Sequence, residues 1–340
     1  MAEATKDRRK ERLDRGIKVR TDGVYAISHW KEIAYLVAPR LLFIVGFLAL
    51  PLILTPFPYW QRVITIVCLY ALLALGFDFL ANYVGLVSLG GGFYMGVGAY
   101  CAAVLNTELG WPIFLTIPVS MVAGGALCTL VLLPCLPLRG VYFAIVSLMF
   151  PLLAGRIIEA LDVLGGTDGI IGLDGFANVW VERYFLISVV LIAVFVLRRL
   201  VNEDVGLVFR GVKDNDQAVK ASGININVYK AFGVFIAASL GCLGGACLAH
   251  IYMWAGISQF ALDFSIIPIA ATVVGGGGTL IGSVLGCLIL VPISELLRDF
   301  GTLRIAVYAI ILTGFIVFKS EGIMVYGTRK YEQFERWVGI

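Results

Sequence analysis

Residues 206–224 read GLVFRGVKDNDQAVKASGI, a polar stretch that lies between two long apolar runs. It carries Arg210, Lys213 and Lys220, and further basic residues flank it on both sides. Lys and Arg between two membrane spans mark the cytoplasmic side. The pattern therefore predicts a short amphipathic helix that is presented to the cytosol, where it can bind a soluble partner.

The composition around this stretch is that of a membrane protein. Of the 340 residues, 60% are hydrophobic and only 14% are charged. Soluble domains have roughly 45–50% apolar and about 25% charged residues. We therefore expect an all-α polytopic membrane protein with about eight to ten transmembrane helices. The basic residues flank the spans, where membrane topology explains them, so nucleic acid is not expected as a partner.

The apolar runs give the expected spans, because a bilayer core of about 30 Å needs roughly 20 apolar residues per helix. These runs are 37–55, 62–80, 92–108, 112–133, 141–160, 184–201, 228–252 and 303–319. Lys and Arg are in excess in segment 1–35, and the C-terminal end, which includes tail 321–340, carries Lys319, Arg329, Lys330 and Arg336. Together with loop 202–227, both ends are thus expected in the cytoplasm, with the transmembrane domain covering 36–320.

This topology requires that residues 262–297 do not cross the membrane as a single span. Gly275–Gly278 interrupt that run near its middle, and consecutive glycines break a helix. The two pieces form either a re-entrant hairpin or two short spans. A second glycine-broken element, GLVSLGGG, stands early in the chain at 85–92.

Paired broken elements in the two halves of a transporter indicate a solute path. We predict that both line one central cavity, in which Ser88, Tyr94 and Thr279 supply polar groups. The glycines expected along this path are Gly90, Gly91, Gly92, Gly275, Gly276, Gly277 and Gly278. Close helix packing is the alternative explanation for such glycines, and the two are compatible.

Motifs for catalysis and metal binding are missing from the sequence. There is no GxxxxGK[ST] phosphate loop, HExxH or GxSxG, so we expect neither an enzyme nor a bound cofactor. The seven cysteines show no metal spacing and fit small packing residues. His250 ends an apolar run, where we expect an interfacial polar residue. Asp78 lies near the inner end of its span, where a snorkelling or helix-pairing role is expected.

Segment 165–175, GGTDGIIGLDG, is predicted to lie outside the membrane. A flexible loop is the simplest interpretation. The alternative is a gate or a docking surface for a solute-binding protein, formed by Thr167, Asp168 and Gly169.

Several motifs in a fixed order resemble one family. They are YVGLVSLGGGFYMGVGAY at 83–100, LRGVYFAIVSLMF at 138–150, GGTDGIIGL at 165–173, the 206–224 stretch followed by NINVYK, VVGGGGTLIGSVLG at 273–286 and FKSEGIMVYG at 318–327. The chain resembles the longer of the two permeases of bacterial branched-chain amino-acid ABC importers. Two positions depart from the family pattern: Gln217 replaces a glutamate, and Ser320 replaces a proline.

The resemblance implies a permease in the bacterial inner membrane. Its partners would be a second, homologous permease, two cytosolic ATP-binding subunits and a periplasmic solute-binding protein. Segment 206–224 is similar to the part that contacts the ATPases. Its expected coupling residues are Arg210, Val212, Asp214, Gln217, Ala218, Val219, Ala221 and Gly223. Among them, Val212, Ala218 and Val219 are the expected apolar anchors, and Gly223 is expected to end the helix.

Two other function classes were weighed. An ion-coupled secondary transporter would place ionisable residues inside its spans, and this chain has few. A membrane enzyme would need the catalytic groups that are missing. The substrate itself, whether a branched-chain amino acid, urea, an amide or an aromatic acid, is not specified by these motifs.

Overall fold

The structure is a computed structural model that describes residues 30–138, 140–297, 310, 313–314 and 322–325. Residues 1–29 and 326–340 lie outside the described part, so the predicted cytoplasmic segments at both ends stay predictions. The same holds for Ser320 and for most of the expected span 303–319. Residues 30–45 form the first part of helix α2 and belong to one unit, and the unit from Gly46 onward is described below.

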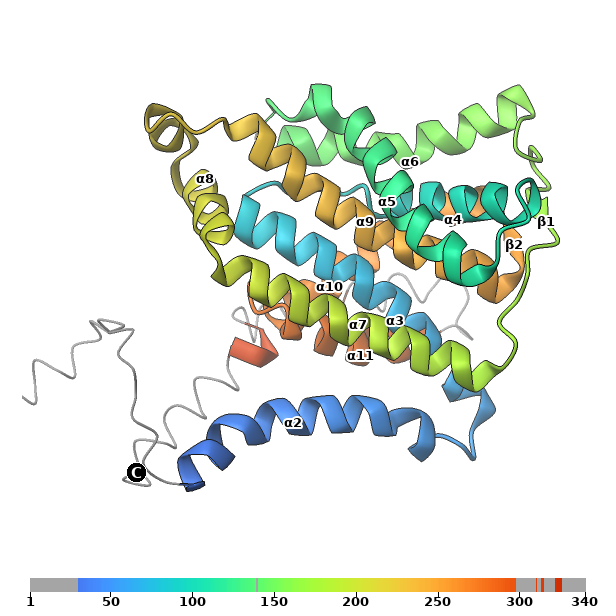
Figure 1. The fold of residues 1–340 in the computed structure, drawn as a ribbon, viewed down its shortest axis with the longest axis horizontal. Helices are drawn as coiled ribbons and strands as arrows, with labels where there is room; N and C mark the ends of the chain where they lie inside the picture. The colour runs from blue at the N-terminus through green and yellow to red at the C-terminus, as the bar shows by residue number, and fades with distance from the viewer. Residues whose placement is uncertain (1–29, 139, 298–309, 311–312, 315–321, 326–340) are drawn as a thin grey trace, which may run out of the picture. The chain divides into compact units, whose positions relative to one another are not determined.

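Long helices make up almost all of this second unit (Figure 1). The α-helices are α2 (Trp30–Ile53), α3 (Pro58–Phe79), α4 (Gly91–Thr107), α5 (Ile113–Leu132), α6 (Val141–Leu161), α7 (Val179–Asn202), α8 (Asp204–Ala221), α9 (Ile226–Tyr252), α10 (Asp263–Gly275) and α11 (Ile281–Leu296). The shorter elements are a π-helical turn (Leu80–Val84), two 3-10 turns (Leu133–Cys135 and Ile257–Phe260) and the strands β1 (Ile170–Ile171) and β2 (Trp254–Ala255).

Six helical segments of the described residues are long and apolar enough to cross a membrane, which confirms the all-α polytopic fold. Their buried fractions divide them into inner and outer helices. Most of α3 and α9 is buried, whereas less than half of α5, α6 and α7 is. Helices α4 and α5 pack along α9, and α10 and α11 pack along α3. The core therefore forms around α3 and α9, and the other spans keep apolar faces for lipid or partner subunits.

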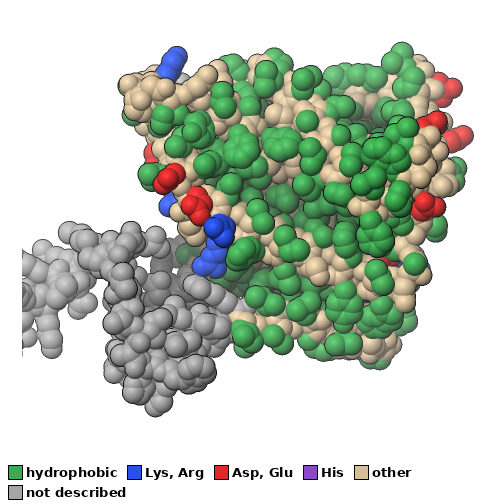
Figure 2. Space-filling model, viewed as in Figure 1, with side chains coloured by type: hydrophobic (Ala, Val, Ile, Leu, Met, Phe, Trp, Pro, Cys, Tyr) green, Lys and Arg blue, Asp and Glu red, His purple; other side chains and the backbone are tan. Residues whose placement is uncertain are grey.

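The two ends of the bundle differ in charge (Figure 2). Acidic side chains gather at the end that carries β1 and β2, whereas both acidic and basic side chains are seen toward α8 at the other end. Asp162, Asp168 and Asp174 all belong to the first of these ends, in the segment that contains β1. The distribution agrees with the predicted orientation, in which α8 faces the cytosol. We refer to these as the outer end and the α8 end.

Candidate translocation and coupling sites

The glycine run that was predicted to break segment 262–297 does so. Helix α10 ends at Gly275, α11 begins at Ile281, and the two pack against each other as a hairpin. Between them the backbone turns through positive φ values at Gly276 (108°), Gly278 (81°) and Leu280 (56°). The Thr279 hydroxyl donates to the Gly276 carbonyl at 2.7 Å and accepts from the Gly282 N–H at 3.0 Å. We call residues 276–280 the glycine turn.

A carboxylate from another helix holds this turn. Asp78 of α3 is completely buried, and its Oδ1 accepts the Gly278 N–H at 2.6 Å while Oδ2 accepts the Leu280 N–H at 2.9 Å. The Asn82 amide donates to Oδ1 at 2.6 Å. The snorkelling role expected for Asp78 is therefore wrong. Its carboxylate does pair helices, but it does so through the backbone at the start of α11, which carries partial positive charge.

The first glycine cluster serves close packing instead. A Cβ on Gly91 would collide with the Phe264 carbonyl, and one on Gly92 would lie 2.7 Å from the Ala261 carbonyl. The Gly92 N–H donates to the Ser265 hydroxyl at 3.0 Å. The start of α4 therefore lies directly against the start of α10, as small residues allow.

Hydroxyl groups near this cluster form hydrogen bonds with one another and with the backbone. Ser88 Oγ and Tyr94 Oη lie 3.0 Å apart, and the Leu89 N–H donates to Ser147 Oγ at 2.9 Å. Ser88, Gly91 and Tyr94 border a cavity of only about 20 Å³. Neither the glycine turn nor Thr279 lines it. Within the described residues, this cavity thus does not join the two clusters: backbone fills the contacts of Gly91 and Gly92, and the Asn82 side chain lies against Gly277.

A larger polar pocket lies at the outer end. Its volume is about 570 Å³, and it is bordered by α3, the end of α9, the start of α10 and the end of α11. Among its lining residues are Trp254, Gln259, Asp263 and Glu295. The Tyr59 hydroxyl donates to Glu295 at 2.8 Å, and Gln259 donates to the Trp254 carbonyl at 3.0 Å. Apolar side chains of α3, α10 and α11 form the rest of the wall. Sequence reasoning missed this pocket, because its residues come from distant segments.

The predicted gate segment contacts a residue that lines this pocket. Strand β1 pairs antiparallel with β2, so that Ile171 lies opposite Trp254. The Trp254 indole N–H donates to the Asp168 carbonyl at 2.8 Å. Gly169, with φ of 74°, packs so closely on the Ala255 carbonyl that a Cβ would collide with it. Asp168 and Gly169 thus contact a tryptophan that lines the outer pocket, and the gate role predicted for Thr167, Asp168 and Gly169 stays a prediction.

Hydrogen bonds with His250 and Asn106 hold the part of this segment around Asp174. His250 is completely buried, with Nε2 2.8 Å from the Thr116 hydroxyl and Nδ1 2.8 Å from the Asp174 carbonyl. Asn106 donates to the Asp174 carboxylate at 2.9 Å and accepts the Asp174 N–H at 2.8 Å. The interfacial position expected for His250 stays a prediction, and the structure adds that the segment around Asp174 covers its side chain.

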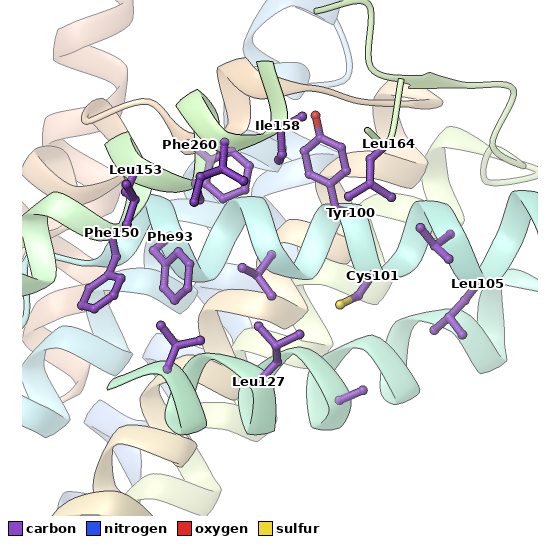
Figure 3. A pocket seen from close by; sticks show the side chains of 16 residues that line it. Phe93, Tyr100, Cys101, Leu105, Leu127, Phe150, Leu153, Ile158, Leu164 and Phe260 are labelled. Carbon is purple, nitrogen blue, oxygen red and sulfur yellow. The ribbon is translucent and has the colours of Figure 1, made fainter. Parts of the chain in front are cut away.

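A third cavity, of about 540 Å³, is almost wholly apolar (Figure 3). It lies between α4, α5 and α6, and Phe93, Leu127 and Phe150 are among its lining residues. In Figure 3 the Tyr100 hydroxyl lies on the side of Ile158 and Leu164. This cavity offers no set of polar groups to a polar solute, so the outer pocket is the better candidate for a solute path.

Helix α8 shows the predicted boundaries and one unexpected kink. Asn215 has φ of −156° and ψ of 97°, and its Oδ1 accepts the N–H groups of Gln217 and Ala218 at 3.1 and 3.2 Å. It therefore caps a second helical piece, residues 216–221. The helix ends at Ala221, and Gly223 has a φ of 86°, as expected for the residue that ends it.

The first piece of α8 packs on its own protein. Phe209 and Val212 are buried, and Phe209 contacts the Phe79 ring edge to face at 5.4 Å. Val212 therefore cannot act as an exposed anchor for a partner, because the protein itself covers its side chain. Ala218 and Ala221 are exposed and Val219 is half-buried, so the surface left for a partner is the second piece.

Polar groups line a cleft of about 400 Å³ at the kink. Lys213, Asp214, Asp216 and Gln217 border it from α8, and Lys230 borders it from α9. Lys230 forms an ion pair with Asp216 at 3.8 Å, and Arg210 lies over the Tyr83 ring at 5.8 Å. The kinked segment is thus fixed to the bundle through several polar contacts.

Comparisons with known proteins place the chain in a family. Residues 59–319 match the family described as branched-chain amino acid transport system / permease component. The chain belongs to this family. It is 25% identical over 295 residues to LivM, the high-affinity branched-chain amino acid transport system permease protein of Escherichia coli, with 76% of this chain and 68% of that protein covered.

The LivM protein of Salmonella typhimurium gives the same identity and coverage. A probable branched-chain amino acid transport permease protein of Methanocaldococcus jannaschii is 25% identical over 223 residues, which cover 62% of this chain and 65% of that protein. No solved structure matches the chain. The predicted family is thereby confirmed, and the protein is an integral membrane permease of this family.

Proposed function

We propose that this permease is one transmembrane subunit of an ATP-driven importer for branched-chain amino acids or related small polar solutes. It forms half of the solute path and works with a second, homologous permease, two cytosolic ATP-binding subunits and a periplasmic solute-binding protein. The site of action is the bacterial inner membrane, with both termini in the cytoplasm. ATP hydrolysis belongs to the partner subunits.

The observation that carries this proposal is the form of α8. Its first piece is anchored in the bundle, whereas its second piece is capped by Asn215 and leaves Ala218 and Ala221 exposed at the α8 end. A helix whose first piece is packed on the bundle and whose second piece is exposed suits a docking element, because little conformational freedom is lost when a partner binds.

The outer pocket supports the other half of the proposal. Acceptor groups such as Asp263 and Glu295 stand beside apolar side chains such as Leu69 and Val291. An amino acid with an ammonium group and an aliphatic side chain matches this mixture. Segment 162–178 contacts Trp254, a lining residue of the pocket, and this place beside the pocket suits a gate or a docking surface for a solute-binding protein.

Purification from the native membrane tests the proposal. With an affinity tag on this chain, two ATP-binding subunits and a second permease should co-purify. The complex in liposomes should take up a solute from a panel of amino acids, amides and urea only when ATP and the solute-binding protein are present. Uptake driven by an ion gradient without an ATPase would instead support a secondary transporter.

A further inference from the structure

Asp78 and the glycine turn depend on each other. A carboxylate inside a membrane bundle is costly unless its surroundings stabilise the charge, and such residues are commonly functional. Here the Gly278 and Leu280 N–H groups donate to Asp78, and the start of α11 faces it. These donors exist in this arrangement only while the turn keeps its present shape.

That shape is a strained one. Leu280 has a positive φ of 56°, which is unfavourable for a residue with a bulky side chain, whereas Gly276 and Gly278 adopt positive φ values without such a cost. Strained conformations persist only where the surrounding contacts over-determine them, and they occur where a segment switches. The contacts to Asp78, together with the Tyr83 hydroxyl that donates to the Gly278 carbonyl at 2.5 Å, supply that restraint.

The same restraint reaches α8. Lys213 Nζ donates to the Asn82 carbonyl at 2.9 Å, and the Asn82 amide donates to Asp78. Asn82 lies in the π-helical turn Leu80–Val84, a form of helix that often marks functional sites. Gly85, with φ of 81°, lets the backbone there approach Lys213 within van der Waals contact. A continuous set of contacts thus joins Lys213, Asn82, Asp78 and the glycine turn.

We propose that Lys213, Asn82 and Asp78 are positioning residues that couple the movement of α8 to the conformation of the glycine turn. The inference rests on the proposed function, in which a partner ATPase moves α8. When α8 shifts, Lys213 displaces the Leu80–Val84 turn, and the hydrogen bonds that hold Gly278 and Leu280 are released or reformed. The glycine turn is the switching element, with the two arrangements that such coupling requires.

Two variants test this link, with one matched control. Asp78→Asn keeps the shape of the side chain but sets an N–H₂ donor against a backbone N–H. Lys213→Met removes the contact to Asn82 from an exposed side chain, so the bundle should still fold. Arg156→Met is the control, because it likewise removes one exposed positive charge, but from α6, outside both the Leu80–Val84 contact and the second piece of α8.

The complex of each variant with its partners is reconstituted in liposomes, where ATP hydrolysis and uptake are both measured. Hydrogen–deuterium exchange of residues 276–282 is compared between the nucleotide-free and the vanadate-trapped complex. In the wild type, trapping should change this exchange. In Asp78→Asn and Lys213→Met, hydrolysis should stay within about twofold of wild type while uptake per ATP falls at least about fivefold, the lower end of ordinary coupling.

If these residues only stabilised the fold, the variants would change the exchange of residues 276–282 equally in the nucleotide-free and the trapped complex. If they couple α8 to the turn, the variants should remove the difference in exchange between these two states. If Asp78→Asn does not assemble, Lys213→Met decides alone. Wild-type uptake per ATP in Lys213→Met, or an equal loss in Arg156→Met, overturns the inference while leaving the importer function standing. A wild-type complex without ATP-dependent uptake overturns the proposed function, and this inference with it.

Discussion

The cap at Asn215 gives the sharpest test of α8 as a docking element. The second helical piece, residues 216–221, is too short to be stable by itself in water. Asn215 Oδ1 accepts two of its N–H groups, from Gln217 and Ala218. Replacing a capping Asn by Ala costs about 1 kcal/mol of helix stability. Since about 1.4 kcal/mol is a factor of ten, Asn215→Ala should lower the equilibrium constant for forming this helical piece roughly fivefold.

The affinity of a purified ATP-binding subunit for the permease in nanodiscs measures this effect. We expect a roughly fivefold weaker Kd for Asn215→Ala, because binding must then order the helix. Asn215→Asp should bind like wild type, since Asp caps as well as Asn. The matched control is Asn225→Ala, which removes the equivalent cap from α9, where Asn225 accepts the Asn227 N–H at 3.2 Å. Equal affinities for Asn215→Ala and Asn215→Asp would refute the docking role of the capped piece.

Three further predictions concern other parts of the molecule. Ala218→Asp puts a charge on the exposed face of α8, so co-purification with the ATPase and solute-stimulated hydrolysis should both fall; full stimulated hydrolysis would exclude residues 216–221 from the contact. Gly91→Leu collides with the Phe264 carbonyl and should lower both thermal stability in detergent and uptake, whereas Gly46→Ala, with open space around it, should change neither. Cysteines at Ser222 and Thr167, in a cysteine-free background, should react with impermeant reagents from opposite sides of the membrane; labelling from one side would contradict the topology.

Much of the fold follows from local sequence. The expected spans 62–80, 112–133, 141–160 and 228–252 agree with α3, α5, α6 and α9 to within a few residues, because length and apolarity are local properties. The break at Gly275–Gly278 and the helix end before Gly223 were also predictable, since glycine acts on its own backbone. Segment 262–297 duly forms two helices.

The contacts that define the candidate sites were not predictable in this way. Asp78 binds an N–H group 200 residues further along the chain, and His250 is 134 residues from Thr116. No local pattern encodes such pairs. The amphipathic pattern of α8 identified an apolar face correctly, but it could not tell whether that face packs on the chain itself or on a partner. Val212 was therefore assigned to the partner, although the bundle buries it.

The two glycine clusters, which look alike in sequence, have different physical roles. At Gly91 and Gly92 the backbone of α4 meets the backbone of the segment before α10, so no movement is possible there without separating two helices. The glycine turn is instead held by hydrogen bonds to the Asp78 carboxylate and from the Tyr83 hydroxyl, which can be exchanged without opening the packed core. A change of conformation therefore requires fewer broken packing contacts at the glycine turn than at the Gly91–Gly92 contact of α4. For this reason a small displacement of α8 can act on the hairpin of α10 and α11 while the α4 contact stays fixed.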